Sequence, residues 1–242
     1  MMNKMIWITL FMIILSTNNT KVHAQEVLLE NETEDLYDVP KTGKNRQQYS
    51  HFYSSYGAHV QIEPTEGLKT NPLLSYQFQL GFRQKFKISG LYAMGLDYAI
   101  TWDRYRIVQD DANIFPDNLT HKKEMFGQNA LKLGYYNRFN FDFKRGDHIG
   151  KYLDLGIWGN WVFMSKYVQW DEYENPVNGA TRSKTTFRGI NYDEPFQWGL
   201  QARLGFNRYV LFGSYRMSET FKDTYADLDP GRLLIGFEIS AF

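Results

Sequence analysis

Histidine and serine side chains are the residues of this 242-residue chain that could catalyse acyl transfer. Such a reaction needs a nucleophile with a histidine within hydrogen-bond reach. His59 and His121 are the best-placed candidates, because His51 and His148 are expected at the end of the fold that carries the short connections. No His-x-Ser pairing, glycine-rich phosphate loop or His-Glu-x-x-His motif occurs in the sequence. We therefore predict no catalytic residues.

Two acidic clusters offer oxygen ligands of the kind that Ca²⁺ prefers. They are Asp110-Asp111-x-Asn113 and Asp227-x-Asp229. Neither spacing completes a calcium-binding loop, so we expect both clusters to be solvated turns. The chain has no cysteine, which excludes disulfides, thiolate metal sites and thiol catalysis. We predict neither a metal site nor a cofactor.

The composition favours strands over helices. The chain is 43% hydrophobic and 17% aromatic, with 19 Gly, 17 Tyr and 18 Phe. Its mean hydropathy of -0.49 argues against a bundle of membrane helices, each of which needs a long apolar run. The formal net charge of +0 gives no global basic field, so we predict no nucleic-acid partner.

The first residues predict export across a membrane. Lys4 precedes a short apolar run at 5–15, and Val22-His23-Ala24 supplies a cleavage site. We therefore expect a signal peptide over 1–24, with an uncleaved anchor as the alternative. Residues 25–48, acidic and then basic, are expected to form a flexible periplasmic segment or a docking peptide for a partner. The folded domain is expected over 49–242.

From residue 49 onward, apolar and polar residues alternate with a period of two. The clearest case runs from Phe196 to Asn207, where six apolar residues share one face and polar residues or glycine occupy the other. Strands of this kind are expected at 51–62, 74–85, 92–103, 131–143, 153–167, 196–207, 209–219 and 233–242.

The predicted connections alternate between long and short, and the longest lies at 171–194. An even-stranded barrel with both chain ends at one rim produces this alternation. The sequence therefore predicts an all-β fold: an eight-stranded antiparallel up-and-down transmembrane β-barrel with a polar, side-chain-filled lumen.

Two features indicate that the apolar face points outward to lipid. Glycines concentrate on the polar face, where a narrow lumen is crowded. Bulky aromatic residues, among them Trp102, Trp161, Tyr167 and Phe196, lie on the apolar face near strand ends. The expected lipid-facing residues are Leu96, Leu133, Ile157, Trp198, Leu200, Leu204, Ile235 and Phe237. The expected lumenal polar network is Arg83, Asp97, Lys132, Arg138, Asp154, Arg203, Arg216 and Glu238.

The expected barrel resembles small outer-membrane barrels of OmpA-like architecture. Its aromatic-rich strands and its terminal Phe242 are similar to those of the outer-membrane β-barrel-domain and PorT-like proteins. The resemblance implies insertion by the outer-membrane assembly machinery, and some members of these families serve type IX secretion. Phe242 departs from the usual terminal signal, because the apolar face that runs from Leu233 to Ala241 is one residue out of step with it.

The sequence and the resemblance together predict a non-enzymatic protein of the Gram-negative outer membrane. We expect a structural or accessory subunit of an envelope complex, with type IX secretion as one candidate pathway. Its expected partners are outer-membrane lipid, the assembly machinery and an envelope protein complex. Two alternatives stay open at this point: a lipid A-modifying outer-membrane enzyme, and a soluble lipocalin-like binding barrel.

Overall fold

A computed structural model describes residues 41–62, 67–110, 115–116, 119–142, 146, 148–177, 179–222 and 225–241. The predicted signal peptide, residues 25–40 and Phe242 lie outside the described residues. The described residues all belong to one compact unit, Pro40–Phe242. Within this part of the chain, no helix is long and apolar enough to cross a membrane.

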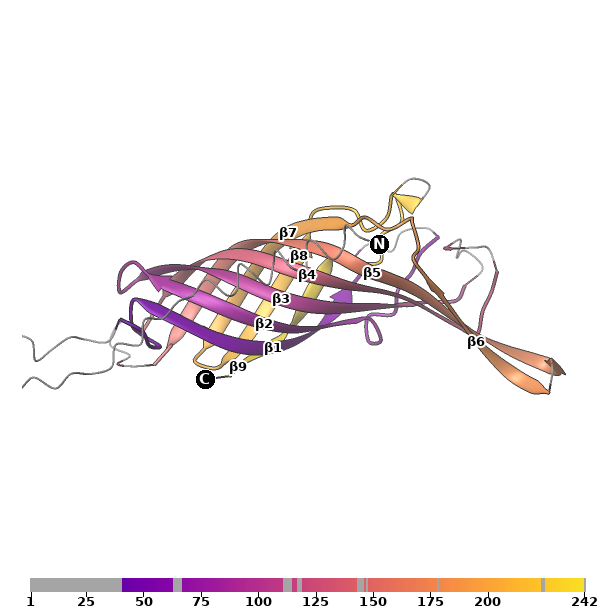
Figure 1. The fold of residues 1–242 in the computed structure, drawn as a ribbon, viewed down its shortest axis with the longest axis horizontal. Helices are drawn as coiled ribbons and strands as arrows, with labels where there is room; N and C mark the ends of the chain where they lie inside the picture. Colours follow the sequence, from indigo (N-terminus) through magenta and orange to yellow (C-terminus); the bar gives the residue numbers. More distant parts are fainter. Residues whose placement is uncertain are drawn as a thin grey trace, which may run out of the picture. The chain divides into compact units, whose positions relative to one another are not determined.

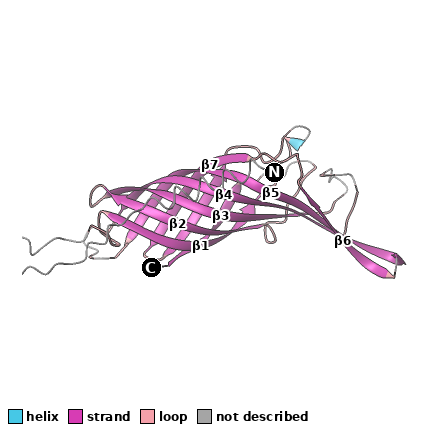
Figure 2. Ribbon diagram, viewed as in Figure 1, coloured by secondary structure: helices cyan, strands magenta, loops and turns pink. Residues whose placement is uncertain are grey.

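The described residues form antiparallel strands in one sheet (Figures 1 and 2), which confirms the all-β antiparallel prediction. The strands are β1 (Gln48–Val60), β2 (Tyr76–Lys87), β3 (Tyr92–Ile107), β4 (Lys123–Asn140), β5 (Lys151–Val177), β6 (Ala180–Arg188), β7 (Phe196–Phe206), β8 (Tyr209–Arg216) and β9 (Leu233–Ala241). The prediction of eight strands was wrong by one, because β6 lies inside the expected long loop at 171–194.

Eight of these strands close into a ring, and β6 lies outside it. Each ring strand pairs with its neighbour in sequence, β5 pairs with β7, and β1 closes the ring on β9. β6 pairs only with the outer half of β5, and the two form a hairpin that projects beyond the other strands (Figure 1). Both faces of β6 are largely exposed, so no alternating apolar pattern marked it in the sequence.

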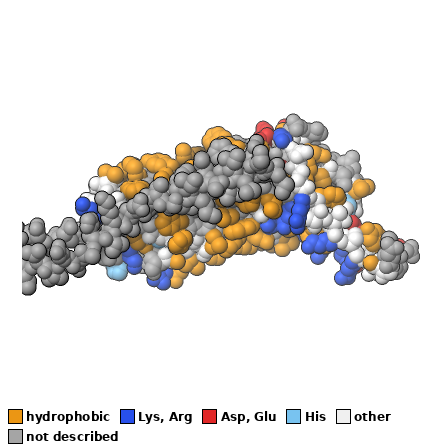
Figure 3. Space-filling view, viewed as in Figure 1, with side chains coloured by type: hydrophobic (Ala, Val, Ile, Leu, Met, Phe, Trp, Pro, Cys, Tyr) orange, Lys and Arg blue, Asp and Glu red, His pale blue; other side chains and the backbone are white. Residues whose placement is uncertain are grey.

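Burial alternates along the ring strands, with polar side chains on the buried face. In β7, the exposed positions are those of Phe196, Trp198, Leu200, Ala202, Leu204 and Phe206, whereas the residues between them are buried. Figure 3 shows apolar side chains over much of the visible surface of the strands. This arrangement is the reverse of a soluble barrel, in which the apolar face is buried.

A β-bulge changes the facing of β5 part-way along its length. The register with β4 shifts at Asn129/Ala130, and Phe163 and Met164 are then both exposed in succession. Because one extra residue reverses the facing of those that follow, Tyr167 points inward and is only 2% exposed. The expectation that Tyr167 lies on the apolar outer face was therefore wrong.

Glycines on the buried face lie directly opposite aromatic rings on the neighbouring strand. The four cross-strand pairs are Tyr53 with Gly81, Tyr136 with Gly95, Trp158 with Gly199 and Tyr152 with Gly205. In each pair, a Cβ atom on the glycine would lie no more than 2.6 Å from the aromatic side chain. The rings therefore occupy the space that a larger residue would fill, which accounts for glycine on this face.

An apolar cluster spans the interior at the end of the ring where the long connections lie. We call it the mouth cluster: Leu68, Tyr105, Ile107, Phe115, Phe126, Tyr167, Phe221 and Leu228. Phe115 is fully buried and contacts five other aromatic rings, from β4, β5 and the connections before β7 and β9. The buried face is thus aromatic at this mouth and polar below it.

We predict that Gly205→Ala destabilises the fold, by about 1–3 kcal/mol in free energy of unfolding. The added Cβ would lie 2.0 Å from Cζ of Tyr152. This ring cannot easily move, because it is buried and the Arg138 guanidinium carbon lies 3.5 Å from the ring centroid. Urea unfolding followed by tryptophan fluorescence measures the change.

Gly213→Ala is the matched control, since a Cβ on Gly213 of β8 would meet no atom within 4 Å. It should change stability by less than about 0.5 kcal/mol. An equal loss of stability in both variants would contradict the proposed fit between glycines and aromatic rings.

Candidate functional site

Six buried charged side chains form a chain of ion pairs across the interior of the ring. In order of contact, the chain is Glu238, Arg83, Asp97, Arg203, Asp154 and Arg138. These residues come from β9, β2, β3, β7, β5 and β4. Since β3 and β7 are not neighbours in the ring, the contact between Asp97 and Arg203 must cross the interior.

Arg83 joins the first two carboxylates of the chain. Its Nη1 and Nη2 atoms donate to the two oxygens of Glu238 at 2.6 and 2.8 Å, the two-pronged geometry that suits a guanidinium. Its Nη2 also donates to Asp97 Oδ2 at 3.1 Å. Tyr53 donates its hydroxyl to the other oxygen of Asp97. Both Arg83 and Asp97 are 0% exposed, so their charges depend on these partners.

Arg203 and Arg138 complete the chain. Arg203 Nη1 donates to Asp97 Oδ2 at 2.5 Å, and its Nε lies 3.4 Å from Asp154 Oδ2. Arg138 then binds Asp154 through two hydrogen bonds, of 2.7 and 2.8 Å. The chain therefore holds three carboxylates and three guanidiniums, and its formal charge is zero.

Tyrosine rings pack against the three guanidinium groups. The Arg83 Cζ atom lies 4.3 Å from the ring centroid of Tyr53, and the Arg203 Cζ atom lies 4.8 Å from that of Tyr136. These are distances at which the ring face attracts a cation. The same tyrosines are the ones that cover glycines on neighbouring strands. The tyrosine rings therefore fit beside the guanidinium groups only because the residues opposite them are glycines.

All eight residues predicted for the polar network are buried, but two lie outside this chain of ion pairs. Lys132 Nζ donates to Gln201 Oε1 at 3.2 Å and lies 5.4 Å from the ring centroid of Trp158. Arg216 Nη2 donates to Asp229 Oδ1 at 2.7 Å, next to the connection that leads into β9. Sequence periodicity gave the facing of these residues but not their partners.

The eight residues predicted to face lipid lie on the other face. Seven of them are between 47% and 56% exposed, namely Leu133, Ile157, Trp198, Leu200, Leu204, Ile235 and Phe237. Leu96 is partly exposed.

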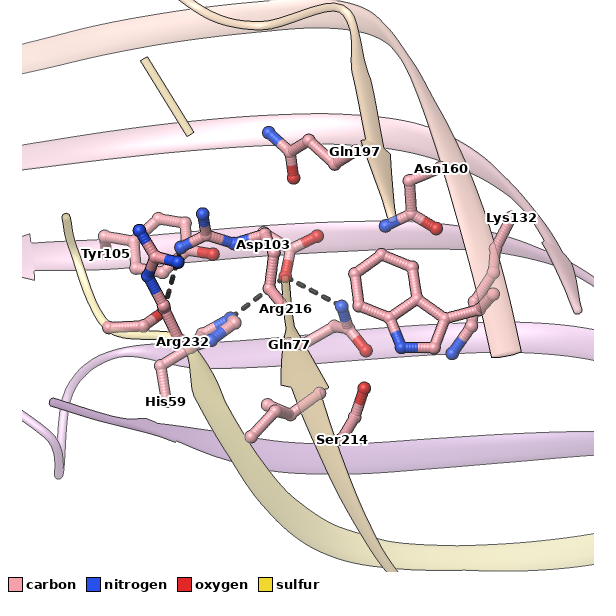
Figure 4. Close-up of a pocket in the computed structure, with 13 residues that line it drawn as sticks. His59, Gln77, Asp103, Tyr105, Lys132, Asn160, Gln197, Ser214, Arg216 and Arg232 are labelled. Carbon is pink, nitrogen blue, oxygen red and sulfur yellow. Dashed lines mark hydrogen bonds and ion pairs between the residues drawn. The ribbon is translucent and has the colours of Figure 1, made fainter. Parts of the chain in front are cut away.

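A small polar cavity lies on the mouth side of the ion-pair chain (Figure 4). Its volume is about 30 Å³, enough for one or two water molecules. Asp103 lies at its centre and accepts hydrogen bonds from Gln77 Nε2 at 2.8 Å and, when that nitrogen is protonated, from His59 Nε2 at 2.9 Å. This cluster was missed in the sequence, although the period of two places Gln77 and Asp103 on the polar face.

The two candidate histidines have carboxylate partners in different places. His59 is 5% exposed and faces the interior cavity with Asp103, whereas His121 Nδ1 lies 2.5 Å from Asp171 Oδ1 beside β5. Ser214 also lines the cavity that holds His59. Because His59 faces the interior, its ring is turned away from the exposed apolar surface.

The acidic clusters considered for calcium are only partly described. Asp229 binds two arginines, Arg216 and Arg232, which occupy its carboxylate oxygens. Asp111 and Asn113 lie outside the described residues. Within the described ranges, no group of three or more His, Asp or Glu side chains is arranged to hold a metal ion.

Neither a protein-family model nor a curated protein sequence matches this chain. The resemblance to small outer-membrane barrels therefore stays a prediction, based on the strand pattern and the aromatic residues.

We predict that Asp97→Asn destabilises the protein by about 3–5 kcal/mol, the usual effect of removing one member of a buried ion pair. The change leaves Arg83 and Arg203 sharing a neutral amide, and the chain of ion pairs then carries an uncompensated positive charge. Urea unfolding of the purified protein measures this loss.

Thr101→Val on the same face of β3 is the control. Thr101 is also 0% exposed, and its hydroxyl has no hydrogen-bond partner among the described residues. Its replacement should change stability by less than about 1 kcal/mol. If Asp97→Asn were as mild as this control, the ion-pair chain would not be a stabilising feature.

Proposed function

We propose that this chain is an eight-stranded transmembrane β-barrel of a Gram-negative outer membrane. In this proposal it acts as a non-enzymatic structural or accessory subunit of an envelope complex. The observation that carries the proposal is the reversed burial of the ring strands: large apolar side chains are exposed, while arginine and aspartate side chains are fully buried. A bilayer is the solvent in which such a surface is stable.

The exposed apolar surface supports this location. Around the ring, residues such as Leu133, Ile157, Leu200, Leu211 and Ile235 are about half exposed or more. Soluble monomers rarely leave a continuous apolar area of this kind in water. A soluble lipocalin-like barrel would bury these side chains in its interior instead.

Closure of the ring supports the same location. Hydrocarbon offers no hydrogen-bonding partner, so a strand that crosses a bilayer must find all its backbone partners in other strands. Each of the eight ring strands has a hydrogen-bonded neighbour on both sides. β6, which has one neighbour, belongs to the hairpin that projects past the ring.

The filled interior argues for an anchor rather than a pore. Arg83, Asp97, Arg138 and Asp154 are each no more than 1% exposed, and the mouth cluster covers the end with the long connections. An eight-stranded ring filled by side chains leaves no route for solutes. The surfaces free to act are then those outside the membrane, above all the β5–β6 hairpin. A role in type IX secretion rests on the family resemblance alone.

The second candidate, a lipid A-modifying enzyme, is favoured by one observation, the contact between His59 and Asp103. That contact faces the interior, where a lipid chain does not reach without opening the ring. Lipid A from cells that carry the native protein or His59→Ala should therefore have the same acylation pattern. A change in acylation that depends on His59 would favour the enzyme.

We predict that Leu200→Arg destabilises the barrel in lipid vesicles by about 2–4 kcal/mol, because it places a cation near the bilayer midplane. Tyr209→Arg, at the turn into β8 where the membrane would end, should cost only about 0–1 kcal/mol. Both native side chains are well exposed, at 47% and 62%. If Leu200→Arg and Tyr209→Arg caused equally small losses of stability, this surface would face water.

Cell fractionation tests the location and the role together. We expect the protein in the outer-membrane fraction, with gel migration that changes on heating, as a folded barrel requires. A pull-down from detergent-solubilised membranes should recover further envelope proteins. Recovery of a lone monomer would contradict the accessory role, and recovery in the soluble periplasmic fraction would contradict the membrane location.

A further inference from the structure

Basic side chains cluster on the outer face of β3–β6, directly beyond the exposed apolar surface. We call this cluster the basic patch: Arg104, Arg106, Lys123, Lys166, Lys184 and Arg188. In Figure 3, lysine and arginine side chains gather on the visible face toward the β5–β6 hairpin. All six residues are partly or well exposed.

Strand register brings five of these residues into two rows. One row runs from Arg104 of β3 across Gly127 of β4 to Lys166 of β5 and Arg188 of β6. Gly127 has no side chain, and the Arg104 side chain lies over it, with Nη1 3.0 Å from the position of a Cβ. The cations of this row thus lie on one continuous surface.

The second row is built around an aromatic ring. Trp170 of β5 pairs with Lys123 of β4 on one side and Lys184 of β6 on the other. The Lys184 Nζ atom lies 5.3 Å from the ring centroid of Trp170, and the Arg106 Cζ atom lies 5.6 Å from it. Tryptophan flanked by cations is typical of the level at which lipid headgroups begin.

The basic patch is not neutralised by carboxylates. Among the described residues, none of its six members forms an ion pair, and Lys166 is repelled by Arg104, Lys184 and Arg188. Neighbouring cations outside the patch are paired, since Lys122 and Arg182 both contact Glu172. Six cations that form no ion pair among the described residues therefore lie together on one side of the ring.

On the proposed membrane location, the basic patch lies at the depth of the lipid phosphate groups. Arg104 follows Trp102 on the same face of β3, two residues further along the strand and thus about 7 Å away. Trp102 itself continues the outward row of Tyr98 and Ile100, both of which are at least 40% exposed. The patch therefore begins where the apolar surface ends, on the side of the long connections.

We propose that the basic patch binds the phosphorylated glucosamine headgroup of an outer-leaflet glycolipid, lipid A. This inference rests on the proposed membrane location. Two rows of cations offer donors to two separate phosphates, and the Arg106 and Arg188 side chains can bind phosphate oxygens through paired N–H groups. The site would hold one glycolipid against the barrel beneath the projecting β5–β6 hairpin.

The test titrates bis-phosphorylated lipid A into the full-length protein in detergent, with native mass spectrometry to count bound lipid. Lys166→Gln/Arg188→Gln should weaken binding by about tenfold or more, since each lost charged hydrogen bond alone can account for about tenfold. Lys41→Gln/Lys151→Gln removes the same charge from exposed positions away from the patch. This control should bind within about twofold of the native protein.

Two further titrations test whether the site recognises the lipid phosphates and whether it requires the whole glycolipid. Lipid A without phosphates should bind no better to the native protein than to the patch variant, and inorganic phosphate should not compete at matched concentration. Equal binding by both double variants, or full competition by inorganic phosphate, would overturn the site. Both double variants should still insert into phosphatidylcholine vesicles with heat-modifiable migration. Failure of the native protein to insert would instead overturn the membrane proposal.

Discussion

Closure of the ring by β1 and β9 is the constraint on which the other features depend. The pairing runs from Phe52 with Ala241 to Val60 with Leu233. It gives eight strands two neighbours each and encloses an interior too narrow for all side chains of ordinary size. A glycine on one strand leaves room for an aromatic ring on the next, as Gly205 does for Tyr152. A looser or open sheet would require neither.

The enclosed interior also determines how charge is distributed. Pairing stabilises buried charges, and three arginines and three carboxylates alternate from Glu238 to Arg138. Toward the long connections the buried face changes to aromatic residues around Phe115, which need no ionic partner. The ion pairs thus connect strands across the ring, and the mouth cluster packs the long connections against the end of the ring. Both sets of contacts oppose opening of the ring.

The outer surface is organised by level as well. Apolar residues cover the ring strands, and the basic patch begins two residues beyond Trp102 on one side only. This asymmetry arises because β5 continues past the ring and carries β6, which brings Arg188 into line with Lys166. The same extension therefore creates both the projecting hairpin and the concentrated positive charge at its base.

The sequence by itself determined the strand type and the facing of most residues, because a period of two is a local property of the chain. Leu200 and Arg203 fall on opposite faces wherever the strand lies. The alternation did not reveal β6, whose two faces are both largely exposed, or the facing of Tyr167, which a bulge reverses.

Only the tertiary structure decided which side chains meet. Asp97 and Arg203 are far apart in sequence and lie on strands that are not neighbours, so their contact depends on the closure and register of the whole ring. The same holds for the pairing of His59 with Asp103 and for the alignment of Arg104 with Lys166. Periodicity gives the direction of a side chain, whereas its partner is determined by strands that the local sequence does not specify.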